Sequence, residues 1–278
     1  MRSFTIALCQ ITPDHDKAAN VDRAFAMVTE AAGRGAELII LPEIFYYPFE
    51  LQGLRRIAGD EEVILRRFKE HARRLGIYLC TGSMVEKRGT RHYNTSRLFG
   101  PDGAELLSYS KCHLFDADLD GIRVRESLVF SHGESFTVAQ TPLGTIGILI
   151  CYDIRFPEMA RQAALLGVDV LLVPAVFNQV TGPAHWECFM RTRAIENQYF
   201  LAAVSQGCTT DPQAPYRAYG HSMLISPWGS VLAEAQEEEC IVYADVDPGE
   251  ITAAKRRLPL LQHRRGKLYT SWYGMESR

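Results

Sequence analysis

The pattern of hydrophobic and polar positions alternates between strand spacing and helix spacing along the whole chain. In the first half, an apolar run at 4–11 predicts a core strand, and apolar positions at helical spacing over 17–32 predict a helix that Gly33 ends. Asp60 can cap a second helix, which ends at Gly76. The other strands predicted in this half are short: 38–41, 77–84, 93–99 and 104–110.

The second half repeats this order of elements without repeating the sequence. Helices are predicted at 157–166 and 183–197. The strands predicted around them are 135–139, 145–151, 168–173, 199–205, 221–226 and 231–245, the last of which can be broken. Two such halves predict two mixed sheets that pack face to face with helices outside. We therefore expect an α/β fold, a four-layer αββα sandwich, as a single domain over 1–278, with a C-terminal arm at about 259–278 that lacks core periodicity.

Composition excludes several classes of protein. With 47% hydrophobic and 23% charged residues the chain can build a large core, and its net charge of −3 and lack of basic blocks argue against nucleic acid or membrane partners. The start of the chain lacks the apolar segment of a signal peptide. Seven scattered cysteines without a C-x-x-C pair, and histidines without metal-ligand spacing, lead us to expect no metal, no cofactor and a cytoplasmic location.

The stretch 143–161 carries the strongest chemical signal. An apolar run changes at Cys151 into a polar turn, and an amphipathic helix follows from Pro157. A strand, a sharp turn and a helix in this order expose one side chain at the rim of a sheet, beside backbone N–H groups. Cys151 is therefore a candidate nucleophile. The alternative is a buried cysteine that packs as a small hydrophobic residue.

Two other predicted strands also end in residues that carry chemistry. Glu43 follows the strand at 38–41, Lys111 follows the strand at 104–110, and Cys151 ends what we expect to be the central strand of the second half. Ligand clefts in open α/β sheets lie beyond the carboxyl ends of strands. A carboxylate, an amine and a thiol brought together there form a working set for acyl transfer.

These residues stand in motifs that resemble the signatures of the nitrilase superfamily of carbon–nitrogen hydrolases. The motifs are Leu41-Pro42-Glu43, KCHLF at 111–115 and ICYDIRFPE at 150–158. The resemblance covers nearly the whole chain and implies the αββα sandwich, a Glu–Lys–Cys triad and hydrolysis of non-peptide C–N bonds. It also implies a second glutamate, which Glu126 matches, although a solvated loop glutamate is the alternative.

The implied chemistry assigns each residue a role. Cys151 attacks the amide carbon, and Glu43 takes the thiol proton, passes it to departing ammonia and then activates water. Lys111 and the N–H of Tyr152 stabilise the oxyanion, and Lys111 offsets the effect of Glu43 on the thiol. Glu126 holds Lys111. His113 and Cys112 adjoin the lysine, but the resemblance gives the role of base to Glu43.

Within the superfamily the chain is most similar to the ω-amidase branch, which hydrolyses the terminal amide of α-keto acids such as α-ketoglutaramate and α-ketosuccinamate. The stretches that carry this similarity are 115–118, 176–187, 193–198 and 219–222. An anionic substrate needs a second cation, for which Arg155 is the candidate; its alternative is an ion pair with Glu158. Phe177 and Tyr47 are candidate walls of the substrate pocket.

Several alternatives remain open at this point. The neighbouring branch acts on deaminated glutathione, and a nitrilase or an N-carbamoyl amine hydrolase shares the same motifs. An inactive scaffold is disfavoured by the complete triad, and an acyl transferase by the lack of an additional membrane segment or domain. The resemblance also implies a homodimer or a higher homo-oligomer, with aromatic residues of 264–273 reaching over a partner subunit.

Overall fold

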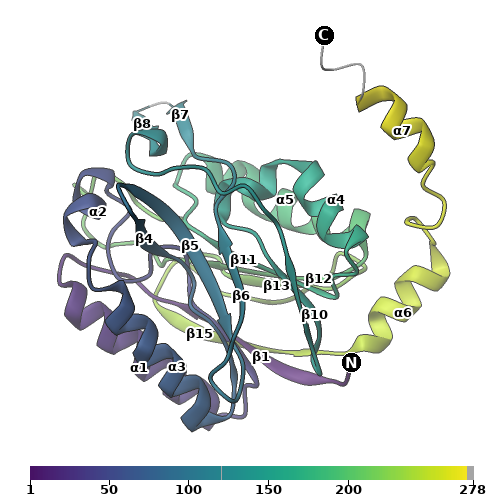
Figure 1. Cartoon of the computed structure of the whole chain (residues 1–278), viewed down its shortest axis with the longest axis horizontal. Helices are drawn as coiled ribbons and strands as arrows, with labels where there is room; N and C mark the ends of the chain where they lie inside the picture. The colour runs from purple at the N-terminus through teal and green to yellow at the C-terminus, as the bar shows by residue number, and fades with distance from the viewer. Residues whose placement is uncertain (120, 274–278) are drawn as a thin grey trace.

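Two β-sheets packed face to face form the centre of the molecule, and helices cover the outer face of each sheet (Figure 1). The computed structural model describes residues 1–119 and 121–273, except for the side chain of Tyr273. The four-layer αββα arrangement expected from the sequence is confirmed.

The first sheet contains seven strands in the order β15-β1-β2-β3-β5-β4, with β6 paired to β5. Its parallel part, β1-β2-β3, places the carboxyl ends of these strands at one edge. The strands are β1 (Phe4–Gln10), β2 (Leu38–Ile40), β3 (Tyr78–Cys80), β4 (Met84–Arg88), β5 (Arg91–Phe99), β6 (Glu105–Ser110) and β15 (Cys240–Val246).

The second sheet contains six strands in the order β14-β13-β12-β11-β10-β9. Here β10, β11 and β12 are parallel, so their carboxyl ends also share an edge. The strands are β9 (Val138–Thr141), β10 (Gly144–Ile148), β11 (Val170–Ala175), β12 (Phe200–Ser205), β13 (Met223–Ile225) and β14 (Val231–Glu234). The expectation that Cys151 ends the central strand of this half is wrong, because β10 ends at Ile148 and lies next to the edge strand β9.

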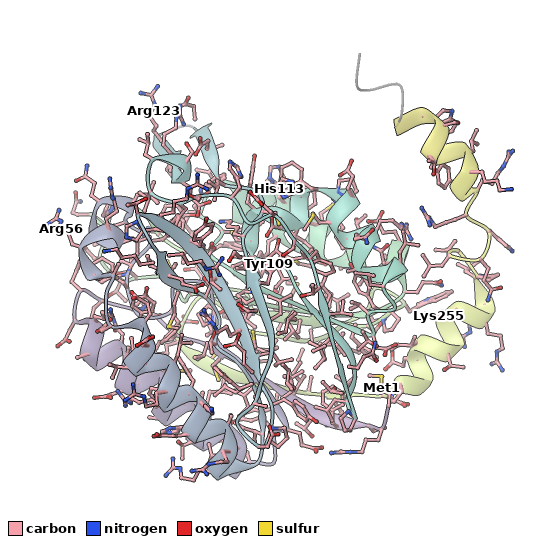
Figure 2. The ribbon with its side chains drawn as sticks, viewed as in Figure 1. Met1, Arg56, Tyr109, His113, Arg123 and Lys255 are labelled. Carbon is pink, nitrogen blue, oxygen red and sulfur yellow. The ribbon has the colours of Figure 1, made fainter. Side chains whose placement is uncertain are left out.

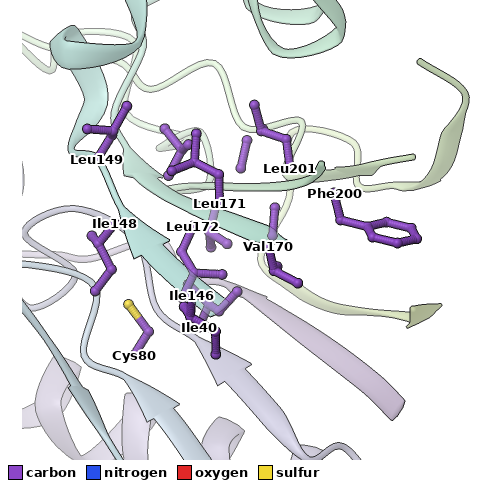
Figure 3. Packing of buried hydrophobic residues seen from close by; sticks show 14 of the residues in the cluster. Ile40, Cys80, Ile146, Ile148, Leu149, Val170, Leu171, Leu172, Phe200 and Leu201 are labelled. Atoms are coloured by element: carbon purple, nitrogen blue, oxygen red, sulfur yellow. The ribbon is translucent and has the colours of Figure 1, made fainter. Parts of the chain in front are cut away.

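Period-two burial explains why the sheets pack as they do. On β1, Ile6 and Leu8 belong to the core between the sheets, whereas Ala7 and Cys9 face the helical layer. Figure 3 shows Ile40 and Cys80 of the first sheet beside Ile146 and other residues of the second. Because both faces of the parallel strands are covered, these strands are mostly apolar rather than alternating.

Four helices form the outer layers. Helices α1 (Lys17–Gly33) and α3 (Glu61–Leu75) cover the first sheet, and α4 (Pro157–Leu165) and α5 (Thr181–Asn197) cover the second (Figure 1). Helix α3 ends as predicted at Gly76, whose φ of 66° is the left-handed conformation that glycine adopts at helix ends. Asp60 precedes α3 but makes no side-chain capping hydrogen bond.

Two predicted strands proved to be composite. The stretch 77–84 contains β3 and the start of β4, which Gly82 separates with a φ of 65°. The stretch 231–245 supplies β14 to the second sheet and β15 to the first, so the break lies where the chain crosses between sheets. Strand β10 stops before Cys151, which instead begins a 3₁₀ turn, η2 (Cys151–Arg155).

Several short elements were not predicted from the sequence. These are α2 (Leu51–Ile57), the hairpin β7 (Asp116–Leu119) and β8 (Ile122–Arg125), the 3₁₀ turn η1 (Glu126–Leu128), α6 (Pro248–Arg257) and α7 (Gly266–Tyr273). Their apolar patterns are too short to show a period. Figure 1 shows that α2 and the β7–β8 hairpin lie at the same end of the molecule.

The C-terminal arm leaves the sandwich after α6, and α7 extends away from the body (Figure 1). Trp272 on α7 is 56% exposed, which is consistent with the predicted arm. The side chain of Tyr273 and residues 274–278, which belong to that prediction, lie outside the described residues. Across the described chain, no helix has the length and apolar character needed to cross a membrane.

Candidate active site

The turn that holds Cys151 is strained, and its strain orients the side chain. Cys151 has a φ of 46°, which L-residues rarely adopt, and it begins η2 directly beyond β10. Its side chain is buried, with only 7% exposure, and Sγ lies 3.8 Å from the carbonyl oxygen of Val176, just past the end of β11. The thiol therefore points to the shared edge where the parallel strands end.

Lys111 lies at the centre of the site. It follows β6 as predicted, its side chain is fully buried, and Nζ is 2.9 Å from Oε1 of Glu43 and 2.9 Å from the carboxylate of Glu126. A lysine ammonium has three N–H donors, so two ion pairs leave one N–H available. The structure thus brings three of the predicted residues into direct contact.

Glu43 reaches the site from the loop after β2. Oε1 of its carboxylate accepts hydrogen bonds from Lys111 and from Nδ2 of Asn94, at 2.9 and 2.7 Å. Oε2 is buried and has no hydrogen-bond partner among residues 1–119 and 121–273. The backbone beyond it is also held, because Nε2 of Gln206 donates to the carbonyls of Glu43 and Ile44 at 3.0 and 2.8 Å. One carboxylate oxygen is therefore fixed in place while the other can accept a proton.

Glu126 is buried, so the alternative of a solvated loop glutamate is wrong. It begins η1, and its Oε2 accepts the N–H of Phe115 at 2.5 Å while the same carboxylate binds Lys111. Burial raises the pKa of Glu126, with Lys111 opposing this shift and Glu43 adding to it. Its contacts match the predicted role of holding Lys111.

Burial, together with the charge of Glu43, favours the protonated form of the Cys151 thiol. Burial raises the pKa of Cys151 well above its usual value, Glu43 raises it further, and Lys111 only partly offsets both. Burial disfavours the ammonium of Lys111, but Glu126 and Glu43 outweigh it and raise the lysine pKa. Lys111 therefore remains a cation, whereas Cys151 needs a base before it can attack.

The loop after Lys111 is tied to the Cys151 turn by Asp153. Its buried carboxylate accepts hydrogen bonds from the N–H and Nδ1 of His113, both at 2.9 Å, from the hydroxyl of Tyr109 at 2.7 Å and from the N–H of Ile150 at 3.1 Å. Figure 2 shows Tyr109 and His113 close together near the centre of the molecule. His113 thus binds Asp153 and has no direct bond to the thiol.

A pocket of only about 10 Å³ lies over the Cys151 thiol. Its lining residues are Phe115, Cys151, Tyr152, Arg155, Val176, Phe177, Thr181 and Tyr216. Three predicted residues, Tyr152, Arg155 and Phe177, are therefore placed beside the thiol. Tyr47 and Cys112 are not among the lining residues; the ring of Tyr47 packs edge-on against His15, with centroids 5.3 Å apart.

Arg155 is a half-buried cation without a carboxylate partner in the described chain. Its guanidinium lies 4.6 Å from the centre of the Phe177 ring and 5.2 Å from that of Phe189, and Nη1 is 3.1 Å from Nδ1 of His185. The alternative ion pair with Glu158 is therefore wrong. Burial lowers the pKa of Arg155, a sign that the cation is partly desolvated.

Four residues of the site were missed from the sequence: Asn94, Asp153, Gln206 and Tyr216. Asp153 follows Cys151 closely, so its place in the motif was the only available signal. Asn94 and Gln206 lie outside the motifs, and Tyr216 lies just before the stretch 219–222, which indicated the branch of the family but no contact with the thiol pocket. Their roles depend on contacts between strand ends, which hydrophobic spacing does not report.

Two packed mixed sheets with a buried glutamate, lysine and cysteine at their strand ends define a hydrolase of carbon–nitrogen bonds. The family model for carbon–nitrogen hydrolases matches residues 5–256, and the chain belongs to this family. The chain is 42% identical over 275 residues to the omega-amidase NIT2 of Danio rerio, an alignment that covers 97% of this chain and 98% of that protein.

Solved structures agree with this assignment. Nit3 of Saccharomyces cerevisiae, described as a member of branch 10 of the nitrilase superfamily, has a TM-score of 0.85 at 33% identity, covering 95% of this chain and 97% of that chain. A variant of the amidase from Nesterenkonia sp. AN1 has a TM-score of 0.81 at 26% identity, covering 97% of each chain. In that variant the active-site cysteine carries the acetamide moiety of fluoroacetamide.

Proposed function

We propose that this enzyme hydrolyses the terminal amide of a small anionic α-keto acid, such as α-ketoglutaramate or α-ketosuccinamate, to the acid and ammonia. The observation that carries the proposal is Arg155, a partly desolvated guanidinium that lines the pocket of Cys151 without a carboxylate partner in the described chain. A guanidinium in this state favours a ligand carboxylate, which it can bind through two parallel hydrogen bonds. The similarity to omega-amidases supports the same substrate class.

In the acylation step, Oε2 of Glu43 accepts the Sγ proton of Cys151 as Sγ bonds to the amide carbon. This assignment is supported by the contacts of Glu43, because Oε1 is held by Lys111 and Asn94 while Oε2 has no partner in the described chain. The third N–H of Lys111 and the backbone N–H of Tyr152 stabilise the oxyanion. The C–N bond then breaks, and Glu43 gives the proton to the departing nitrogen. Ammonia is released, and the acyl group stays bound to Cys151 as a thioester.

In the deacylation step, Glu43 accepts a proton from water as the water oxygen bonds to the thioester carbon. The carbon–sulfur bond breaks, and the proton returns to Cys151. Glu126 takes no proton in this scheme. Its bonds to Lys111 and to the N–H of Phe115 support a positioning role, because they hold the ammonium toward the oxyanion.

A second candidate substrate class is a longer anionic amide, such as deaminated glutathione. A cleft of about 730 Å³ beside the Cys151 pocket favours it, because the cleft has room for a peptide-sized group. The two candidates differ in what fills that cleft. α-Ketoglutaramate would leave it empty.

An ammonia-release assay tests both candidates. The panel contains α-ketoglutaramate, α-ketosuccinamate, deaminated glutathione, glutamine, an N-carbamoyl amino acid and a nitrile, at matched concentrations. We expect the α-keto acid monoamides to give the highest kcat/KM. A higher value for deaminated glutathione would favour the second candidate, and preference for the nitrile or the carbamoyl compound would refute both.

Two further expectations belong to this proposal. The cysteines Cys9, Cys80, Cys112, Cys151, Cys188, Cys208 and Cys240 are all free thiols, which supports a reducing cytoplasmic location. A homodimer is supported by the exposed Trp272 on the extended α7, which offers an aromatic anchor to a second copy.

A further inference from the structure

Two cavities of very different size meet at one side chain. The pocket over Cys151 measures about 10 Å³, and the neighbouring cleft measures about 730 Å³. A cavity needs roughly 10–15 Å³ to hold one water molecule, so the smaller pocket is too small for any amide. Tyr216 lines both cavities, and it also lines a third one of about 220 Å³.

Two contacts hold Tyr216 in this position. Its hydroxyl donates a hydrogen bond of 2.7 Å to the carbonyl oxygen of Val176, the same oxygen that lies 3.8 Å from Sγ of Cys151. Its ring packs against Phe49, with centroids 5.1 Å apart. Burial raises the pKa of Tyr216 well above its usual value, and Cys151 and Glu43 add to the shift, so the hydroxyl stays protonated and able to donate.

The cleft is suited to receive anionic molecules. Its described lining residues include three arginines, Arg55, Arg123 and Arg125, against one glutamate, Glu50. Arg123 and Arg125 both pair with Asp118, and Arg123 projects from the tip of the hairpin (Figure 2). The three arginines still outnumber Glu50 and Asp118, so the cleft keeps a net positive charge that favours the approach of an anionic amide.

We propose that Tyr216 is a gate between the cleft and the Cys151 pocket, closed by its hydrogen bond to Val176, and that anionic amides reach the thiol through the cleft when the ring swings out. This inference rests on the proposed function for the nature of the ligand. The gate itself follows from the cavity sizes and the shared wall. It makes Tyr216 a positioning and access residue that takes no part in the chemical steps.

Thiol alkylation measures access without requiring amide turnover. The full-length enzyme is treated with iodoacetamide, a small reagent, and separately with N-benzylmaleimide, a bulky one, and the modification of each cysteine is followed by peptide mass spectrometry. Both reagents consume the thiolate, so the ratio of their rates at Cys151 cancels changes in the thiol pKa. Cys188 is exposed, so its modification rate shows that each reagent is active. Cys80 is buried, so a rise in its modification rate would indicate partial unfolding.

Tyr216→Ala removes the ring, so the pocket and the cleft become one space. The rate of Cys151 modification by N-benzylmaleimide, divided by the rate with iodoacetamide, should therefore rise by about tenfold or more. Tyr216→Phe keeps the packing of the ring and loses only the hydrogen bond to Val176. The rates of Cys151 modification by both reagents should therefore rise about fivefold. The matched controls Tyr243→Ala and Tyr243→Phe, on β15 away from the cleft, should leave both rates unchanged.

The gate is overturned if Tyr216→Ala keeps the parent ratio at Cys151, or if Cys80 becomes reactive in parallel. Should Tyr216→Ala fail to fold, Tyr216→Phe decides the question, and unchanged rates in that variant overturn the gate. The outcomes are separable from the proposed function. An enzyme that releases ammonia from α-ketoglutaramate but shows no ratio change loses only the gate, and one inert to that amide with the expected ratios loses only the proposed substrate.

Discussion

Substitution of Arg155 tests the proposed substrate class most directly. Arg155→Lys keeps a positive charge but loses the planar fork that binds both oxygens of a carboxylate, and Arg155→Ala loses charge and fork together. The parent guanidinium is already positioned by the Phe177 ring at 4.6 Å and by the hydrogen bond of 3.1 Å to His185. A substrate carboxylate would therefore meet a preorganised cation.

The magnitude follows from the surroundings of Arg155. Two unit charges about 4 Å apart attract each other by about 4 kcal/mol at an effective dielectric constant of roughly 20, and desolvation of the carboxylate offsets part of this attraction. We expect Arg155→Ala to cost about 2–4 kcal/mol for the anionic substrate, which is a fall of roughly 30- to 1000-fold in kcat/KM. Arg155→Lys should fall between the parent and the alanine variant.

The assay compares α-ketoglutaramate with a neutral amide, butyramide, by ammonia release. Butyramide has no carboxylate to bind, so it should react poorly with the parent enzyme and lose much less on either substitution. Arg161→Ala is the matched control, because Arg161 is a half-buried arginine on α4 that is not among the residues lining the Cys151 pocket. Equal losses for both amides would show that Arg155 only supports the turn after Cys151, and would refute the reasoning.

Further substitutions and a measurement of mass in solution test the remaining site and the assembly. Cys151→Ala should abolish turnover with the fold intact by circular dichroism, whereas Cys112→Ala should have little effect; an acyl group trapped on Cys112 by a slow amide would contradict this. Glu43→Gln keeps size but removes the base, so turnover should fall about 10²–10⁴-fold, and activity within a few-fold of the parent would exclude Glu43 as the base. Asp153→Asn places an amide group among four donors, so the free energy of unfolding in urea should fall by about 2–4 kcal/mol; an unchanged value would mean that the tie between the two loops is unimportant. Light scattering at micromolar concentration should show a dimer or larger assembly, and removal of 264–278 should weaken it; a monomeric parent would refute the predicted assembly.

Much of the fold could be predicted from the sequence because burial leaves a local period. Helices α1 and α3 and the core strands β1 and β2 each bury one face or both against a neighbouring layer, and this repeats within each element. The positions of Glu43, Lys111 and Cys151 could be predicted for a related reason. Glu43 and Lys111 come after predicted strands and Cys151 ends one, and the carboxyl ends of parallel strands in an α/β sheet meet at one edge.

Other features depend on partners that are distant in sequence. The stretch 231–245 reads as one broken strand, yet β14 joins the second sheet and β15 pairs with β1, more than 200 residues earlier. Hydrophobic alternation shows that a strand has a buried face, but it does not show with which strand it pairs. Only the packing of the two sheets decides which edge each strand completes.

The same limit applies to the partners of the site residues. Spacing left open an ion pair of Arg155 with Glu158 as the alternative to substrate binding, but the turn that begins at Cys151 directs the guanidinium to Phe177 and His185. Tyr216 lies outside the motifs, just before the stretch 219–222, and its sequence position does not show that it lines the pocket over the thiol. The sequence by itself determined most of the core strands and the helices that cover them, the family motifs and the residues at the strand ends. The tertiary structure decided what each side chain meets, because the direction of a side chain after a turn depends on backbone geometry and on packing across the whole chain.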